Sequence, residues 1–297
     1  MKDSNTKSNS VLIAGCGDLG IRTGTALAAL GWQVHGVRRN CSLLPAQFTA
    51  HQADYTVPGA LEFLPDLRPD LVLATFNPSA RSVAGYRRGF TASAANLLAA
   101  LGEHRPGRIL FVSSTRVFAE SSGGWVDEHS ALSADDERAL AIIEAERILL
   151  DSPHPVSVVR FGGIYGSPGG RLLSRIARGE LCDPEPGRWS NRIHREDCAG
   201  FLAQLLRSAS AGEDLEPVYI GVDDQPVLQY EVEVWLAREL GVTAGGPVTA
   251  ASAEAATGKR CGNRLLHASG YRLRFPDYRS GYREVIAGAD AARVVKR

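Results

Sequence analysis

Residues 11–20 read Val-Leu-Ile-Ala-Gly-Cys-Gly-Asp-Leu-Gly, and this stretch decides the fold. Its four leading apolar residues predict a buried strand. Glycines follow at positions 15, 17 and 20 in the spacing G-x-G-x-x-G, and Ile21 to Leu30 continues with helical spacing. A glycine-rich structural turn is the alternative, but the order of strand, glycines and helix favours a dinucleotide-binding fingerprint.

Each glycine has a physical role in such a site. Gly15 permits the tight turn out of the strand, Gly17 lets the backbone approach a pyrophosphate, and Gly20 lets the helix pack closely on the strand. At the helix N-terminus, around Asp18 and Leu19, backbone N–H groups and the positive end of the helix dipole favour phosphates. We therefore expect these five residues to bind a dinucleotide.

The next strand, Trp32 to Val37, ends in Arg38-Arg39-Asn40 and indicates which dinucleotide binds. Sites for NAD usually place an Asp or Glu here to hold the ribose 2′-hydroxyl. Two arginines stand here instead, and their planar forks of donors suit a phosphate dianion. The sequence predicts NADP, with NAD as the alternative; a preference of roughly ten- to a hundredfold corresponds to about 1.5–3 kcal/mol. A solvated pair of surface arginines is the other interpretation.

Composition excludes several classes of protein. The chain has 297 residues, of which 33 are Lys or Arg and 33 are Asp or Glu, so no net charge favours nucleic acid or an anionic membrane. Its five cysteines are scattered without C-x-x-C spacing, which predicts free thiols and no zinc or other metal site. The first ten residues are polar and lack the apolar core of a signal peptide. We expect a cytoplasmic protein with a small-molecule substrate.

Strands and helices alternate along the chain, which predicts an α/β fold with a doubly wound parallel sheet, a Rossmann fold of about seven strands. The sequence predicts a dinucleotide-binding domain at residues 1–165. Residues 166–297 would complete the sheet at about 190–222 and form a small C-terminal substrate lobe. We also expect a polar loop around Gly123, a loose connection at residues 244–257 and two short helices within residues 259–287.

Residues at the carboxyl ends of the strands are candidates for ligand binding, because doubly wound sheets bind ligands at that edge. Asp54 stands where a third strand would end. It accepts a hydrogen bond from an adenine amino group in one interpretation, and caps the following short helix in the other. Ser113 and Ser114 stand at the end of the fifth strand, and Ser113 is a further candidate cofactor-binding residue.

Several motifs together resemble the extended short-chain dehydrogenases/reductases, the group of NAD(P)-dependent epimerases and dehydratases. The motifs are the glycine stretch, Ser113-Ser114-x-x-Val117-Phe118, Arg160-x-Gly162-x-Ile164-Tyr165-Gly166, Ile193-His194-x-x-Asp197, and Lys259-Arg260 with Gly270-Tyr271. The resemblance runs along most of the chain. It implies the Rossmann fold, a nicotinamide dinucleotide as cofactor, and oxidoreductase or epimerase-like chemistry.

The resemblance also implies a catalytic Tyr-x-x-x-Lys pair and a Ser or Thr, and here the chain departs from the family. Matching the family's following glutamate to Glu146 places the tyrosine at Arg138 and the lysine at Ile142, and no Tyr-x-x-x-Lys occurs in the chain. Ser114 matches the catalytic Ser/Thr position. Tyr165 is our candidate for the replacement acid, with loop structure as its alternative, and Arg138 is either an anion ligand or a solvated arginine.

Two functions remain open at this stage. One is an NADP-preferring oxidoreductase or epimerase-like enzyme with an atypical active site, and the other is a non-catalytic NADP(H)-binding sensor or regulatory protein. The family's nucleotide-sugar enzymes usually have an arginine at the place of Ser190, which weakens the case for a nucleotide sugar. Family members often dimerise through two long helices, here residues 79–101 and 134–150, so a homodimer is possible.

Overall fold

The computed structural model describes residues 8–243, 253 and 255–294; the expectations for the first seven residues and for most of 244–257 lie outside this part. A seven-stranded parallel sheet has the order β11-β7-β5-β4-β1-β2-β3. Its strands are β1 (Ser10–Ala14), β2 (Gln33–Arg38), β3 (Thr49–Gln52), β4 (Leu71–Ala74), β5 (Arg108–Ser114), β7 (Val156–Phe161) and β11 (Val218–Gly221). The predicted α/β doubly wound fold is confirmed.

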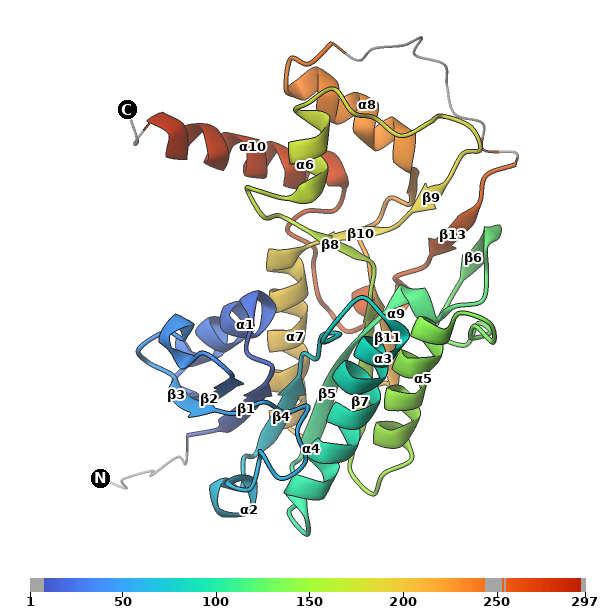
Figure 1. Cartoon of the computed structure of the whole chain (residues 1–297). Helices are drawn as coiled ribbons and strands as arrows, with labels where there is room; N and C mark the ends of the chain where they lie inside the picture. Colours follow the sequence, from blue (N-terminus) through green and yellow to red (C-terminus); the bar gives the residue numbers. More distant parts are fainter. Residues whose placement is uncertain (1–7, 244–252, 254, 295–297) are drawn as a thin grey trace. The chain divides into compact units, whose positions relative to one another are not determined.

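Figure 1 shows the helices of the described residues together with this sheet. They are α1 (Asp18–Ala28), α2 (Leu64–Leu67), α3 (Val83–Tyr86), α4 (Ser93–Leu101), α5 (Glu137–Leu150), α6 (Arg171–Ile176), α7 (Arg195–Ser210), α8 (Gln229–Glu239), α9 (Arg264–Ala268) and α10 (Tyr278–Val294), with 3-10 turns η1 (Cys41–Leu43) and η3 (Thr115–Val117) and a π-helix η2 (Arg87–Ala92). The strand order reverses after β3, and right-handed crossovers then place α1 and α4 on opposite faces of the sheet.

The register of the central strands brings the candidate residues to one edge. Ala14, the last residue of β1, is opposite Val37 on one side and Ala74 on the other. The turn is tied to both neighbours, because Cys16 N–H donates to the Val37 carbonyl at 2.9 Å and Thr75 N–H donates to the Ala14 carbonyl at 2.9 Å. The ends of β1, β2 and β4 therefore coincide, next to the glycine turn.

The chain forms two compact units. Unit 1 comprises residues 1–117, 133–160 and 199–219, and unit 2 comprises residues 118–132, 161–198 and 220–297. Unit 2 contains three short strand pairs made by β8 (Gly163–Tyr165) with β10 (Arg192–His194), β9 (Trp189–Ser190) with β12 (Val227–Leu228), and β6 (Ser122–Val126) with β13 (Gly258–Cys261).

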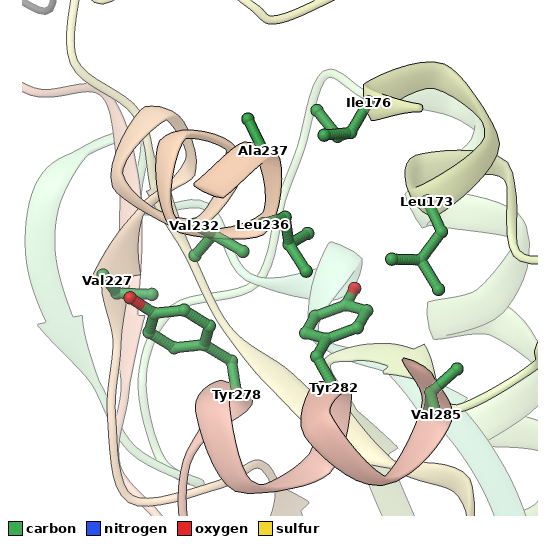
Figure 2. Packing of buried hydrophobic residues seen from close by; sticks show 9 residues of the cluster. All are labelled: Leu173, Ile176, Val227, Val232, Leu236, Ala237, Tyr278, Tyr282 and Val285. Carbon is green, nitrogen blue, oxygen red and sulfur yellow. The ribbon is translucent and has the colours of Figure 1, made fainter. Parts of the chain in front are cut away.

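Unit 2 has an apolar core of its own. Figure 2 shows side chains of α6, α8 and α10 converging, with the rings of Tyr278 and Tyr282 on α10 facing the aliphatic residues of α8. Both tyrosines are almost fully buried, as are Leu236 and Ile176. Burial of large side chains contributes about 1.5–3 kcal/mol each, so this cluster supplies much of the cohesion of unit 2.

Two local predictions were wrong. The polar segment around Gly123 is not a loop, because residues 122–126 form β6, which pairs in parallel with β13. A partner that is distant in sequence overrides the loop-like composition. The last helix is not short either, since α10 spans 17 residues. On α5, where a dimer contact is expected, Ile143 and Leu149 are buried and Leu140 is exposed, so the homodimer stays a prediction.

Candidate functional site

The glycine turn has the backbone geometry that the sequence predicts. Gly15 has φ +89°, and a Cβ on it would lie 2.6 Å from the Thr75 carbonyl oxygen. A Cβ on Gly20 would lie 2.8 Å from Cγ2 of Ile13, so only glycine lets α1 pack this closely on β1. For Gly17 the nearest atom to such a Cβ is 3.8 Å away. Gly17 therefore leaves open space where a ligand can approach the backbone.

Helix α1 begins directly after Gly17, its N-cap residue, and no described side chain caps it. The Asp18 carboxylate lies beside Arg22, one turn further along the helix, and both its oxygens accept from Nε of Arg22 at 3.2 Å. Asp18 and Leu19 are thus placed in the first turn, where their backbone groups face the space beyond Gly17. This terminus has the polarity that suits a phosphate group.

A cavity of about 300 Å³ lies at the carboxyl ends of β2, β3 and β4 in unit 1. Its lining comprises Arg39, Asp54, Tyr55, Thr56, Asn77, Pro78, Ser79 and Arg88. Of the two arginines that the sequence singled out, Arg39 lines this cavity, whereas Arg38 is the last residue of β2 and is not part of the lining. The structure therefore separates two neighbours that looked equivalent in the sequence.

Asp54 is held at the wall of this cavity by an Asx turn. Its Oδ1 accepts from Thr56 N at 3.0 Å and from Thr56 Oγ1 at 2.7 Å. The next helix, α2, starts only at Leu64, so the helix-cap interpretation of Asp54 is wrong. Burial raises the pKa of the Asp54 carboxyl. The Thr56 hydrogen bonds and the charges of Arg39 and Arg88 together lower it by more, so this pKa lies below its usual range.

The strand end beside this cavity contains a buried polar network. Ser113 Oγ donates to Glu146 Oε1 at 2.5 Å, while Arg160 donates from Nε to Oε1 at 3.1 Å and from Nη2 to Oε2 at 2.7 Å. The two charged side chains are 2% and 5% exposed. The Ser113 hydroxyl is thus engaged inside unit 1, and its role toward a cofactor stays a prediction.

The two positions of the family's catalytic pair have different environments. Arg138 is exposed in the first turn of α5, whereas Ile142 lies in the core, 2% exposed. Ser114 is half-buried at the end of β5, and its Oγ accepts from Arg116 N at 3.2 Å. The candidate catalytic hydroxyl of Ser114 is therefore positioned by a local turn.

Tyr165, the other candidate catalytic residue, belongs to unit 2 and is closely packed there. Its ring stacks on Tyr282 with a centroid distance of 4.4 Å, and its hydroxyl donates to the Asp277 carbonyl at 3.4 Å. Gly281 leaves room for this hydroxyl, and burial raises the Tyr165 pKa far above its ordinary value. These contacts favour a structural role, and a catalytic role for Tyr165 stays a prediction.

Unit 2 has a cavity of about 390 Å³ beside α6 and α8. Glu233 is fully buried and is one of the lining residues. Its Oε2 accepts from Cys182 N at 2.6 Å, and its Oε1 accepts from Gln229 at 2.5 Å and from Arg175. Charged side chains of both signs line the rest, including Arg188 and Asp183. This cavity is therefore polar, and its carboxylates outnumber its guanidinium groups by one.

Comparisons with known proteins place the chain in a family. No family model matches it. A solved structure from Methylobacillus flagellatus, assigned to the NAD-dependent epimerase/dehydratases, is 33% identical, covers 94% of this chain and 98% of its own, and has a TM-score of 0.82. The chain belongs to the NAD-dependent epimerase/dehydratase family. The resemblance based on the motifs is thereby confirmed.

Two further proteins match this chain over most of their length. Protein YeeZ of Escherichia coli (strain K12) is 26% identical over 276 residues, which are 90% of this chain and 96% of that protein. The Bordetella bronchiseptica enzyme WbmG, in complex with NAD and UDP, is 16% identical with a TM-score of 0.79, over 96% of this chain and 95% of that chain. The latter likeness shows a shared fold.

Arg88 and Tyr55 are among the residues of the cavity in unit 1 that sequence reasoning missed. Arg88 follows β4 by more than ten residues, yet it lines the cavity together with Arg39, and its Nε donates to Thr56 Oγ1 at 3.3 Å. The ring of Tyr55 stacks on Phe76 at 5.0 Å and lies against Gly15. The Arg87-Arg88 pair is visible in the sequence. The sequence does not show which of the two arginines faces the carboxyl ends of the strands, because this depends on how the helix packs.

Among the described residues, no group of His, Cys, Asp and Glu side chains could hold a metal ion, and all five cysteines are free. No helix in the same part of the chain is both long enough and apolar enough to cross a membrane.

Proposed function

We propose that this protein is an NADP-preferring oxidoreductase or epimerase-like enzyme acting on a small molecule. The observation that carries the proposal is the pair of guanidinium groups, Arg39 and Arg88, in the cavity at the ends of β2–β4. With one carboxylate, Asp54, the cavity has an excess of one positive charge. A 2′-phosphate dianion fits this excess better than a hydroxyl does.

The residues present fit a dinucleotide. Gly17 leaves open space beside the start of α1 for a diphosphate, and Arg39, which lines the cavity, would hold the 2′-phosphate. Asp54 and Tyr55 would flank the adenine. When bound, the nicotinamide supplies or accepts a hydride. We assign Ser114 to hold the substrate oxygen by a hydrogen bond, and residues 166–297 to supply the substrate lobe.

The substrate we propose is not a nucleotide sugar, although WbmG was crystallised with UDP. Ser190 stands where an arginine would meet the diphosphate, and Arg192 does not replace it. Arg192 is buried, and its two Nη atoms donate to Ser190 Oγ at 2.7 Å and to Gln229 Oε1 at 2.6 Å. Because this guanidinium is buried and already bonded to two side chains, it is poorly accessible to a ligand phosphate.

Calorimetric titration with NADPH, NADH, NADP and NAD tests the cofactor assignment. We expect Arg39→Ala to weaken NADPH binding roughly ten- to a hundredfold while changing NADH binding little. Arg87→Ala is the matched control, because Arg87 adjoins Arg88 but is exposed and lies 3.8 Å from Glu137. Equal losses for NADPH and NADH in Arg39→Ala would refute the NADP preference, and no binding of any of the four would refute the function.

The alternative function, a non-catalytic NADP(H)-binding sensor, is favoured by one observation. Arg138 and Ile142 occupy the positions of the family's tyrosine and lysine, and Ile142 is part of the core. A sensor should bind NADPH and NADP with affinities that differ at least about tenfold and should oxidise NADPH with no carbonyl compound. Turnover of any carbonyl that is lost in Ser114→Ala would exclude this alternative.

A further inference from the structure

Tyr86, the last residue of α3, is a candidate for a proton donor. Burial raises the pKa of the tyrosines at positions 55, 165, 271, 278 and 282, which makes these phenols poor proton donors at neutral pH. Tyr86 is half-buried in unit 1, and no described residue forms a hydrogen bond with its hydroxyl. It lies just beyond the loop that follows β4, at the edge where the candidate ligand site is found.

Two glycines hold Tyr86 close to that edge. A Cβ on Gly85 would lie 2.4 Å from the Ala80 carbonyl oxygen, and one on Gly89 would lie 2.2 Å from the Asn77 carbonyl oxygen. The helix therefore packs against the loop after β4 on both sides of Tyr86. The π-helix η2 starts at the next residue, Arg87, and such π segments are frequent at functional sites.

Two cations flank the Tyr86 ring. The guanidinium carbons of Arg116 and Arg138 lie 6.0 and 5.9 Å from its centroid. Arg116 is paired with Asp136 at 2.8 Å, whereas Arg138 has no carboxylate partner among the described residues. Arg138 is also in the first turn of α5, where the helix dipole disfavours a cation. Its position is therefore unfavourable for the helix itself, and its positive charge is available to Tyr86.

The same contacts connect Tyr86 to Ser114. Arg116, whose side chain faces the Tyr86 ring, donates its backbone N–H to Ser114 Oγ at 3.2 Å. Tyr86, Ser114, Arg116 and Arg138, the Tyr86 cluster, thus gather two hydroxyl groups and two guanidinium groups within unit 1. These are the chemical groups that the family's Ser, Tyr and Lys provide, but here the phenol and a cation come from different helices.

We propose that Tyr86 is the proton donor and acceptor of this enzyme, an inference that rests on the proposed function. A proton passes from Tyr86 Oη to the carbonyl oxygen of the substrate as the carbon accepts a hydride from the reduced dinucleotide, and an alcohol forms. The electron pair of the broken O–H bond remains on Oη. Arg116 and Arg138 stabilise this negative charge until water returns a proton, and alcohol oxidation uses the same groups in reverse.

The first test compares NADPH oxidation, with a panel of aldehydes and ketones, in Tyr86→Phe and Tyr165→Phe. We expect Tyr86→Phe to lower kcat roughly 100- to 10,000-fold. Its NADPH affinity, measured by titration, should stay within about twofold, since the phenol is not part of the cavity at β2–β4. Full turnover in Tyr86→Phe refutes the inference alone, whereas failure of the wild-type protein to bind NADPH refutes the proposed function.

The second test needs no substrate. Tetranitromethane nitrates tyrosine through its ionised form, and the rate at Tyr86 is followed by peptide mass spectrometry. We expect Arg116→Gln and Arg138→Gln each to slow nitration of Tyr86 several-fold, because each removes a charge beside the ring. Arg147→Gln is the control, since Arg147 is on the same helix as Arg138 and is exposed. Unchanged rates in both Tyr86-cluster variants overturn the inference, even if no carbonyl is turned over.

Discussion

Removing the Glu146 carboxylate tests the network at the end of β5. Glu146→Ala leaves Arg160 with a guanidinium group that is 5% exposed and has lost its hydrogen bonds to the Glu146 carboxylate. The Ser113 hydroxyl loses its 2.5 Å acceptor as well. Breaking a buried ion pair on one side costs about 3–5 kcal/mol, because the remaining charge stays buried without the carboxylate that compensated it.

Urea unfolding followed by circular dichroism measures this loss. We expect the free energy of unfolding to fall by about 3–5 kcal/mol in Glu146→Ala, seen as a lower midpoint at an unchanged slope. The matched control is Glu144→Ala, two positions earlier on α5. Its carboxylate is exposed, and its 3.7 Å pair with Arg147 predicts a change below about 0.5 kcal/mol.

A double substitution separates the charge from the packing. Glu146→Leu/Arg160→Met replaces both charged side chains with apolar ones, so we expect it to be more stable than Glu146→Ala. A loss of less than about 1 kcal/mol in Glu146→Ala would refute the reasoning, because it would mean that water or another group compensates Arg160.

Three further predictions concern other parts of the chain. Gly17→Ala should leave stability within about 1 kcal/mol but weaken NADPH binding about tenfold, whereas Gly20→Ala should cost about 1–3 kcal/mol through overpacking; thermal unfolding and titration separate the two. Burial raises the pKa of Asp223 to about 8, so the contribution of this group to stability is greatest below about pH 4 and is lost as the pH rises to 8. Asp223→Asn should remove this contribution to the pH dependence in urea titrations. Asp197→Ala should speed hydrogen exchange at the two backbone amides, 2.7 and 3.0 Å away, that donate to this buried carboxylate; unchanged exchange would contradict that anchoring role.

Much of the fold could be predicted because its signals are local. The apolar run before Gly15 and the helical spacing after Gly20 depend on residues that are neighbours in the chain, and β1 and α1 form there. Strand β7 has the predicted bounds, 156–161. Strand β6 was missed because its partner, β13, lies more than 130 residues away and its own composition is that of a loop.

The candidate site was only partly predictable. The glycine turn and Arg39 are recognisable because their positions follow from a single strand–turn–helix unit. Arg88 was missed because its place in the cavity depends on how the helix after β4 packs against the loop at Asn77. Ser113 looked like a ligand residue, and its hydrogen bond to Glu146 spans 33 positions.

The sequence by itself determined the glycine turn, the alternation of strands and helices, and hence the sheet and its ligand-binding edge. The reason is that backbone freedom and hydrophobic period act over a few residues. Only the tertiary structure decided which side chains meet at that edge: Arg88 with Arg39, and Tyr86 with Arg116 and Arg138. Such encounters depend on close packing between elements that are distant in the chain.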